Sequence, residues 1–395
     1  MITIGLLLPP SAWAGDKFKV LHAFGKGKDG GGVYDGVALD ARGDLYGTTS
    51  GGGAYGYGTV FRLSPSQGGK WTETILHSFC ATPRCTDGAL PFAGVVLDLA
   101  GNLYGSSDIA TFQMSPNSFA PQGWSFKVIY EVGSRSSLIL DQVGNLYGPL
   151  GLGQYGKGAV TELSPGSDGW TGTYLYSFCP KPLLHCLDGD DPDSPLIWDA
   201  SGNLYGTTIG GGKGQGGVAF ELEHNSDGWK EHVLHNFPAS TGDGFPPSSG
   251  LTLDKAGNLY GTTLQGGNGG GFGTVFKLSR GADGRWKETI LYDFPTLKDG
   301  AGPEGGLAID QAGNLYGTSG GGIGPCGGGG CGVVFKMTPP KSGSGKWTYT
   351  VLHRFTGPDG ALPVAGPTLD DKGNLYGTTS TGGAGGYGVV FEITP

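Results

Sequence analysis

The chain has 395 residues, of which 82 are glycine and 25 are proline, and its formal net charge is -9 at pH 7. This acidic balance disfavours nucleic acids and other polyanions as partners, and no stretch approaches the ~20 apolar residues of a membrane-spanning helix. The 8 tryptophans, 17 tyrosines and 18 phenylalanines are enough for a folded core, which excludes a disordered glycine-rich chain.

Residues 1–14 are similar to the end of a secretory signal peptide. An apolar run precedes the sequence Ala-Trp-Ala at residues 12–14, and such a pattern of small residues is typical of a signal-peptidase site. A basic region before the apolar run is missing, so the alternatives are a start further upstream and a frayed tail. We expect residues 1–14 to be a signal-peptide remnant and residues 15–395 to form a single exported domain.

One sequence unit recurs along the rest of the chain and is clearest at residues 257–278, GNLYGTTLQGGNGGGFGTVFKL. Its Leu-Tyr-Gly core occurs seven times, at intervals of 43 to 60 residues. The tyrosines of the cores are Tyr46, Tyr104, Tyr147, Tyr205, Tyr260, Tyr316 and Tyr376. Such a repeat indicates an array of modules that bury their apolar faces against their neighbours.

Each unit contains four short runs that are rich in β-branched and aromatic residues. In the clearest copy they are residues 250–254, 258–263, 273–278 and 286–294. None has helical periodicity, so all four are predicted to be strands. Four antiparallel strands per unit are typical of a β-propeller blade. A tryptophan begins most fourth runs, and we expect it to pack between blades; the alternative is a row of sugar-stacking side chains.

The turn between the first and second runs has the pattern D-x-x-G-N. Its aspartate can bond the turn backbone and its glycine can take a positive φ. We therefore interpret the seven aspartates as turn caps and not as a catalytic or metal-binding row. They are Asp40, Asp98, Asp141, Asp199, Asp254, Asp310 and Asp370.

The two ends of the chain predict how the array closes. Residues 388–395 form a third run with no fourth run after it, and residues 16–24 form a fourth run with no unit before it. The N-terminal strand should complete the last blade and leave no exposed sheet edge. The predicted fold is therefore all-β, a seven-bladed β-propeller with four antiparallel strands per blade.

The six cysteines form three near-neighbour pairs, each across a proline- or glycine-rich turn. The pairs are Cys80 with Cys85, Cys179 with Cys186, and Cys326 with Cys331. Sequence alone allows 15 pairings, and the alternative of a zinc site lacks the C-x-x-C spacing. We predict three loop-pinning disulfides, which favour a secreted, extracellular or periplasmic protein.

Strand counting places the loop between the second and third strands on the same face as the loop between blades. This variable face is where function is expected. Asp-Gly pairs in the blade-to-blade loops form either an acidic ring around the central funnel or ordinary turns. From them we expect Asp87, Asp299 and Asp359 to bind ligand, and Asp188 and Asp243 to be catalytic candidates.

Residues 188–193 contain four carboxylates, Asp188, Asp190, Asp191 and Asp193. Oxygen-rich clusters suit Ca²⁺, although the EF-hand spacing is absent. The alternatives are a Ca²⁺ site and a solvated acidic loop. We expect no other cofactor.

Blades two and three break the repeat, because the loop at residues 131–137 is short and lacks Asp-Gly. Arg135 in this loop should face the acidic loop of blade four, and it is the third catalytic candidate; a decayed repeat is the alternative. Trp198, which replaces a Leu or Ile, either binds ligand or fills core volume. Aromatic residues on the glycine-rich loops either stack sugars or pack beneath the loops. They are Tyr57, Tyr155, Phe272 and Tyr387.

Together, the GNLYGTT strand, the glycine-rich loop, the G-T-V-F strand, W-x-E-x-x-L-H-x-F and D-G-x-x-P resemble the GloVer tandem repeats of the "choice-of-anchor" bacterial surface proteins. The likeness covers nearly the whole mature chain. It implies export, a propeller-like array and display at the cell exterior, without an established reaction. The chain stops at Pro395 with no sorting signal or hydrophobic tail, so we expect a free or truncated form.

The sequence thus predicts a secreted, monomeric binding module whose variable face recognises a neutral glycan or another extracellular, cell-surface ligand. The first alternative is a glycoside hydrolase or polysaccharide lyase that uses funnel carboxylates with help from Arg135. The second is a structural surface-display repeat with no small ligand. No nucleophile elbow, Walker motif or Rossmann fingerprint occurs in its required context.

Overall fold

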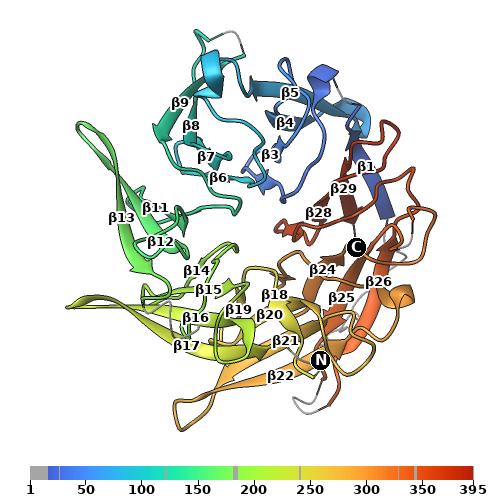
Figure 1. The fold of residues 1–395 in the computed structure, drawn as a ribbon. Coiled ribbons are helices and arrows are strands. Elements are labelled where there is room, and N and C mark those ends of the chain that lie inside the picture. Colours follow the sequence, from blue (N-terminus) through green and yellow to red (C-terminus); the bar gives the residue numbers. More distant parts are fainter. Residues whose placement is uncertain are drawn as a thin grey trace, which may run out of the picture.

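The structure, a computed structural model, describes residues 17–394 apart from residues 26, 121, 181–185, 240–241, 328 and 342–344. The described strands form seven antiparallel sheets in a ring around a central axis, as Figure 1 shows. This confirms the predicted seven-bladed β-propeller. The proposed signal segment, residues 1–14, lies outside the described residues.

Each blade has four strands that follow one another from the axis outward (Figure 1), and the sheet of blade 5 has a short fifth strand. Blade 1 contains β2 (Ala38–Leu39), β3 (Leu45–Thr49), β4 (Thr59–Pro65) and β5 (Trp71–Ser78); blade 2 contains β6 (Val95–Leu97), β7 (Leu103–Ser106), β8 (Thr111–Pro116) and β9 (Trp124–Tyr130); blade 3 contains β10 (Ile139–Leu140), β11 (Leu146–Pro149), β12 (Ala159–Gly166) and β13 (Gly169–Ser177). Blade 4 contains β14 (Ile197–Trp198), β15 (Leu204–Thr208), β16 (Gln215–Asn225) and β17 (Gly228–Pro238); blade 5 contains β19 (Thr252–Leu253), β20 (Leu259–Gln265), β21 (Thr274–Arg280) and β22 (Trp286–Asp293), with β18 (Phe245–Pro247) paired to β20. Blade 6 contains β23 (Ala308–Ile309), β24 (Leu315–Ser319), β25 (Val333–Thr338) and β26 (Thr348–Arg354); blade 7 contains β27 (Thr368–Leu369), β28 (Leu375–Thr379), β29 (Val389–Thr394) and β1 (Lys17–Ala23). Short 3₁₀ turns lie in the loops: η1 (Gly27–Asp29), η2 (Gln67–Gly69), η3 (Pro83–Cys85) and η5 (Leu297–Asp299).

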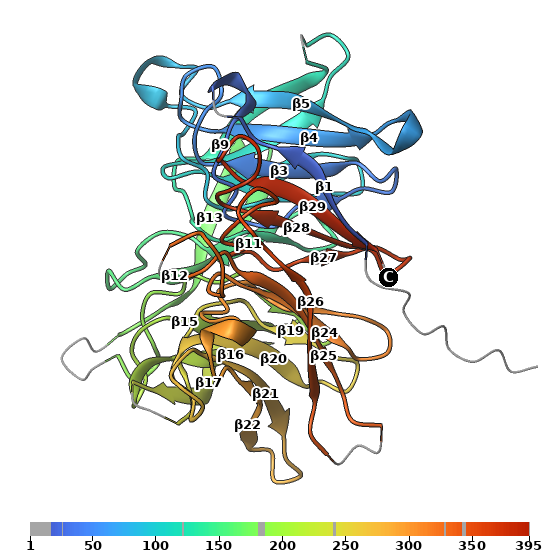
Figure 2. The same cartoon turned by 90° about the vertical axis from the view of Figure 1, so that its right-hand side faces the viewer.

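The N-terminal strand closes the ring, as predicted. β1 pairs antiparallel with β29, with Lys17 opposite Thr394 and Ala23 opposite Val389. Figures 1 and 2 both show the blue N-terminal strand beside the red C-terminal strand. The pairing supplies the outermost strand of blade 7 and covers the edge that β29 would otherwise expose.

The turns between the first and second strands are built alike in all seven blades. In blade 5, Asp254 Oδ1 accepts hydrogen bonds from the backbone N–H groups of Ala256 and Asn258, both at 2.9 Å. Its Oδ2 accepts bonds from the Asn258 side-chain amide at 2.8 Å and from the Tyr260 hydroxyl at 2.9 Å. The other six aspartates accept the same pair of backbone bonds. The repeated aspartates are therefore turn caps.

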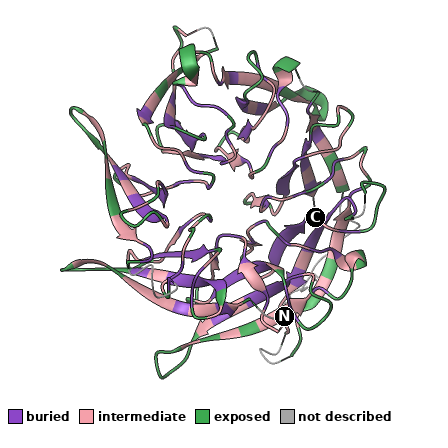
Figure 3. Ribbon diagram, viewed as in Figure 1, coloured by how far each residue is buried: buried purple, intermediate pink, exposed green. Residues whose placement is uncertain are grey.

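Apolar side chains fill the wedges between neighbouring blades, and the largest fully buried ones are all phenylalanines. Figure 3 shows the buried residues inside the sheets and the exposed ones mainly on the peripheral loops. The repeated tyrosine packs on a tryptophan of the next blade, for example Tyr46 on Trp124 and Tyr260 on Trp347, each with ring centroids 6.0 Å apart. The tryptophans thus pack between blades and do not form a stacking row.

The blade-to-blade loops and the loops between second and third strands share one face. Isolated bridges join them, for example Gly31 to Gly51 and Ala301 to Gly321. All three predicted disulfides are formed, and all lie in these loops. Within the described residues, no helix has the length and apolarity that crossing a membrane requires.

Candidate functional site

A funnel of about 370 Å³ lies at the centre of the variable face. Every blade contributes to its wall, at the point where the blade-to-blade loop enters the innermost strand. Ligand sites are typically concave and held by a rigid scaffold. The funnel is therefore the candidate binding site.

One position per blade places a side chain in this funnel. In blade 6, Glu304 is exposed while its neighbours Pro303 and Gly305 are buried. The seven equivalent residues form what we call the rim: Tyr34, Phe92, Arg135, Asp193, Ser248, Glu304 and Val364. The backbone repeats from blade to blade, but the rim residue differs in every blade, so the rim is chemically asymmetric.

The rim residues of blades 1 to 3 form a partly aromatic wall. The rings of Tyr34 and Phe92 meet edge to face with centroids 5.3 Å apart. The Arg135 guanidinium carbon lies 5.8 Å from the Phe92 ring centroid, within the range of a cation–π contact. Tyr34 remains 44% exposed, which leaves its ring accessible to a ligand.

The rim residues of blades 4 and 6 are acidic. Partial burial raises the pKa of the Glu304 carboxyl above its ordinary value of 4.5. Burial by the funnel wall also raises the pKa of Asp193, although its surface is exposed; the charge of Arg135 acts in the opposite direction and that of Asp191 adds to the increase. The two carboxyls therefore hold their protons more tightly than free carboxyls do.

A further carboxylate, Asp35, braces the funnel wall. Its side chain accepts hydrogen bonds from the backbone N–H groups of Gly36 at 2.7 Å and Gly94 at 2.9 Å, and from the Ser137 hydroxyl at 2.6 Å. These donors belong to blades 1, 2 and 3, so Asp35 ties together the three blades that carry the aromatic wall.

Of the three catalytic candidates, only Arg135 lines the funnel. Asp188 accepts hydrogen bonds from the Tyr176 hydroxyl at 2.8 Å and from the Cys179 backbone N–H at 3.0 Å. Asp243 lies with its carboxylate 3.7 Å from His235 Nε2. The structure places both aspartates at junctions between blades and does not bring them together with Arg135.

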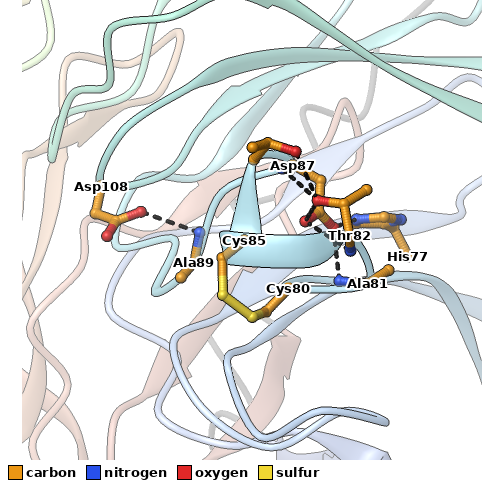
Figure 4. The surroundings of a disulfide bond; sticks show 9 residues. His77, Cys80, Ala81, Thr82, Cys85, Asp87, Ala89 and Asp108 are labelled. Atoms are coloured by element: carbon orange, nitrogen blue, oxygen red, sulfur yellow. Dashed lines mark hydrogen bonds and ion pairs between the residues drawn. A yellow bond between two sulfur atoms is a disulfide. The ribbon is translucent and has the colours of Figure 1, made fainter.

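The aspartates expected to bind ligand occupy the same kind of junction. Asp87 is 4% exposed beside the Cys80–Cys85 disulfide, and it is hydrogen-bonded to the His77 ring at 3.1 Å and the Thr82 hydroxyl at 2.7 Å (Figure 4). Asp359 is bonded in the same way to His353 and Thr356, and Asp299 accepts a bond from the Thr296 hydroxyl. These carboxylates cap their loops, and none lines the funnel.

The four carboxylates of residues 188–193 have separate surroundings. Asp190 pairs with Lys157 at 3.2 Å, Asp193 belongs to the rim, and Asp191 is exposed. Among the described residues, they do not form a group of three ligand atoms within 4.8 Å of one another. Binding of Ca²⁺ by this loop stays a prediction.

The predicted aromatic residues lie outside the funnel lining. Tyr57, Tyr155 and Tyr387 are 45%, 39% and 37% exposed on their glycine-rich loops. Phe272 is partly buried against the apolar cluster between blades 5 and 6, and Trp198 packs in the cluster between blades 3 and 4. Of this set, the three tyrosines keep accessible rings.

Sequence reasoning missed five rim residues: Tyr34, Phe92, Ser248, Glu304 and Val364. A signal for most of them exists, because the residue after the proline of D-G-x-x-P varies while its neighbours are stereotyped. The pattern was visible, but only the fold shows that this position faces the axis.

The chain is similar in sequence to one family of repeats. A profile of the Gloeobacter/Verrucomicrobia repeat matches residues 110–324 and, overlapping them, residues 226–395. No curated protein matches the chain in sequence.

Several solved structures are similar to the chain. The extracellular domain of a protein described as a one-component system of B. thetaiotaomicron has a TM-score of 0.55 at 11% identity, and the match covers 94% of this chain but only 39% of that one. PorZ, a surface component of the type-IX secretion system of Porphyromonas gingivalis, has a TM-score of 0.47 at 13% identity, covering 94% and 47%. A gluconolactonase of Xanthomonas campestris has a TM-score of 0.41 at 16% identity, covering 74% and 82%.

Proposed function

The chain belongs to the Gloeobacter/Verrucomicrobia repeat family, and from this premise we propose that it is an exported propeller that binds a neutral glycan in its central funnel. The observation that carries the proposal is the chemical asymmetry of the rim. Three disulfides support export, because such bonds persist in oxidising compartments outside the cytoplasm.

The rim offers the two kinds of contact that sugars need. The exposed Tyr34 ring, next to Phe92, is a stacking face for the apolar side of a pyranose. Across the funnel, Asp193 and Glu304 can accept hydrogen bonds from hydroxyl groups, and Arg135 can donate them. The acidic residues disfavour an anionic glycan and the arginine disfavours a cationic one. A neutral, hydroxyl-rich ligand suits both.

The test compares two tyrosines of nearly equal exposure. Tyr34 is 44% exposed in the funnel and Tyr57 is 45% exposed on an outer loop. The secreted chain is screened against neutral, acidic and amino oligosaccharides, and a bound glycan is then titrated calorimetrically into the Tyr34→Ala and Tyr57→Ala variants. We expect Tyr34→Ala alone to weaken binding, by tenfold or more, which corresponds to ~1.4 kcal/mol.

Loss of binding in Tyr57→Ala alone would move the site to the glycine-rich loops. No binding of any oligosaccharide to the unchanged protein would contradict the proposal and favour a structural display repeat.

A second candidate function is a glycoside hydrolase or polysaccharide lyase. The observation that favours it is the raised pKa of Glu304 in a funnel that also holds Asp193, because a general acid must keep its proton near the working pH. Release of reducing ends or unsaturated products from a bound glycan, abolished in Glu304→Gln, would establish it. Binding without product would leave the glycan-binding module.

A further inference from the structure

The junctions between neighbouring blades repeat three side-chain positions. The first is the polar residue two places before the closing aromatic of an outermost strand. The second is the aspartate of the Asp-Gly pair in the loop that follows this strand. The third lies two residues after the tryptophan position on the outermost strand of the next blade. Two junctions carry histidine, aspartate and glutamate at these positions. We call them the closure junction (His22, Asp29 and Glu73) and the middle junction (His235, Asp243 and Glu288).

The closure junction brings together residues of blades 7 and 1, next to the strand β1 that closes the ring. His22 lies on β1 of blade 7, and Glu73 lies on β5 of blade 1. His22 Nε2 is 3.2 Å from Asp29 Oδ1 and 3.7 Å from Glu73 Oε1. The buried Glu73 Oε1 has no hydrogen-bond partner.

The middle junction has the same composition and a more open spacing. His235 Nε2 is 3.7 Å from Asp243 Oδ2 and 3.5 Å from Glu288 Oε2. The side chain of Glu288 is only 9% exposed, and both its Oε1 and the His235 Nε2 are buried without a hydrogen-bond partner. Buried polar atoms are nearly always paired. The two unpaired atoms therefore indicate that a bound ligand supplies the missing partner at this junction.

The spacing in both junctions fits ligands of one metal ion. One ligand atom from each of the three residues lies within 4.8 Å of the others. Two ligands at about 2.0–2.1 Å from a tetrahedral Zn²⁺ ion are roughly 3.3–3.4 Å apart, which is close to the observed 3.2–3.7 Å. A histidine nitrogen with carboxylate oxygens favours Zn²⁺ over Ca²⁺ or Mg²⁺, which prefer oxygen alone.

The other junctions show what these positions do when either the histidine or the glutamate is replaced. His77 stacks on Phe126 with ring centroids 3.8 Å apart, and His353 stacks on Phe18 at 3.6 Å. Between blades 3 and 4, Glu231 is present but tyrosine replaces the histidine, and its hydroxyl bonds the loop aspartate. Among the described junctions, histidine meets glutamate only at the closure and middle junctions.

We propose that the closure and middle junctions each bind a divalent transition-metal ion of the Zn²⁺ class through their histidine, aspartate and glutamate. Each ion links the outermost strand of one blade to that of the next. At the closure junction, the ion links the N-terminal strand β1 to the outermost strand of blade 1.

The experiment titrates ZnCl₂ into the full, untagged chain after treatment with a chelator. Calorimetry should count two equivalents of Zn²⁺, and the thermal midpoint should rise with Zn²⁺ concentration because the ion binds only the folded state. Glu73→Gln and Glu288→Gln should each remove one equivalent, and the double variant both. Glu231→Gln, the matched control, should keep two.

A second variant guards against misfolding as the cause of a lost equivalent. Glu288→Phe recreates at the middle junction the histidine–phenylalanine stack that the chain already uses at His77 and Phe126, so it should fold and bind one equivalent. No Zn²⁺ binding by the unchanged protein, or two equivalents retained in the double variant, would overturn the proposal. If only one of the variants Glu73→Gln and Glu288→Gln removes an equivalent, the proposal stands for that junction and is overturned for the other.

Discussion

The two ends of the blades' inner strands differ in what the repeat preserves. At the turn end, all seven blades place an aspartate that accepts the same two backbone hydrogen bonds. At the funnel end, the equivalent rim position carries a different residue in each blade. The turn end uses one repeated side chain to hold the fold, whereas the rim carries varied side chains on a repeated backbone. This freedom makes the rim the part of the scaffold suited to recognition.

Asp254 at the turn end and Glu304 at the funnel end have pKa values shifted in opposite directions. Burial alone would raise the pKa of Asp254, but hydrogen bonds from Asn258, Tyr260 and Ala256 outweigh it and lower the pKa below 3.8. In the funnel, burial raises the pKa of Glu304 with no such compensation. The Asp254 carboxyl is therefore stabilised as an anion, whereas burial disfavours the charged forms of Glu304 and Asp193.

The largest expected effect is on the turn side of this comparison. Asp254→Ala removes the acceptor of four hydrogen bonds, two from backbone N–H groups, one from the Asn258 side-chain amide and one from the Tyr260 hydroxyl. It should lower the free energy of unfolding by about 2–3 kcal/mol. Asp254→Asn keeps one acceptor and should cost less. Urea denaturation measures both. An unchanged unfolding free energy in Asp254→Ala would show that the turn bonds do not hold the fold.

On the rim side, Phe92→Ala should act in the opposite way. The substitution removes the ring that contacts Tyr34 edge to face and lies under the Arg135 guanidinium, so glycan affinity should fall about tenfold or more. The free energy of unfolding should fall by only about 1–2 kcal/mol, because the Phe92 ring is only partly buried. Calorimetric titration and urea denaturation of the same variant separate the two effects. Lost stability with retained affinity would place the rim among the structural elements.

A pH series distinguishes the Asp254 carboxyl from that of Glu304. The lowered pKa of Asp254 contributes stability that is present above pH 3.8 and lost as the pH falls through the folded value. The raised pKa of Glu304 has the opposite sign, so its stabilising contribution is present below pH 4.5 and lost as the pH rises through the folded value. Protonation of Glu304 removes the charged acceptor that we propose for the glycan. As the pH falls, glycan affinity should therefore begin to decrease above pH 4.5, before Asp254 is protonated. The profile should be flatter in Glu304→Gln, and equal profiles would exclude Glu304 from binding.

The smallest effect is expected from exchanging rim residues between blades. Glu304→Ser copies the residue that blade 5 carries at the same position, Ser248. Because Glu304 is exposed, we expect the free energy of unfolding to change by less than about 0.5 kcal/mol, measured from the shift in the thermal midpoint. A much larger loss would show that rim residues are matched to their own blades.

The sequence predicted the fold well because each structural rule is local and repeated. The D-x-x-G-N turn, the β-branched runs and the split last blade each follow from short-range chemistry, and the paired strands β1 and β29 confirm the closure. The disulfides were predictable for the same reason. The Asp-Gly aspartates were harder, since their role depends on bonds to His77 and His353 of the preceding outermost strands, a pairing that the turn pattern alone does not reveal.

The rim could be predicted only in part. Arg135 was noticed because its loop breaks the repeat, and Asp193 because it ends an acidic run. Glu304 follows a regular D-G-x-x-P copy, and Tyr34 follows a copy with Val33 in place of the proline. Nothing local reveals that their side chains point to the axis. Their proximity arises from seven blades meeting, which is a property of the closed ring.

The most direct test of the funnel rim as the binding site is a calorimetric titration of one neutral oligosaccharide, selected by the screen, into the unchanged chain and into a Tyr34→Ala, Glu304→Gln double variant with its urea denaturation midpoint measured in parallel. We predict binding of one oligosaccharide per chain, abolished in the double variant at an unchanged midpoint. Equal affinity in the two proteins would contradict the assignment of the funnel rim as the binding site.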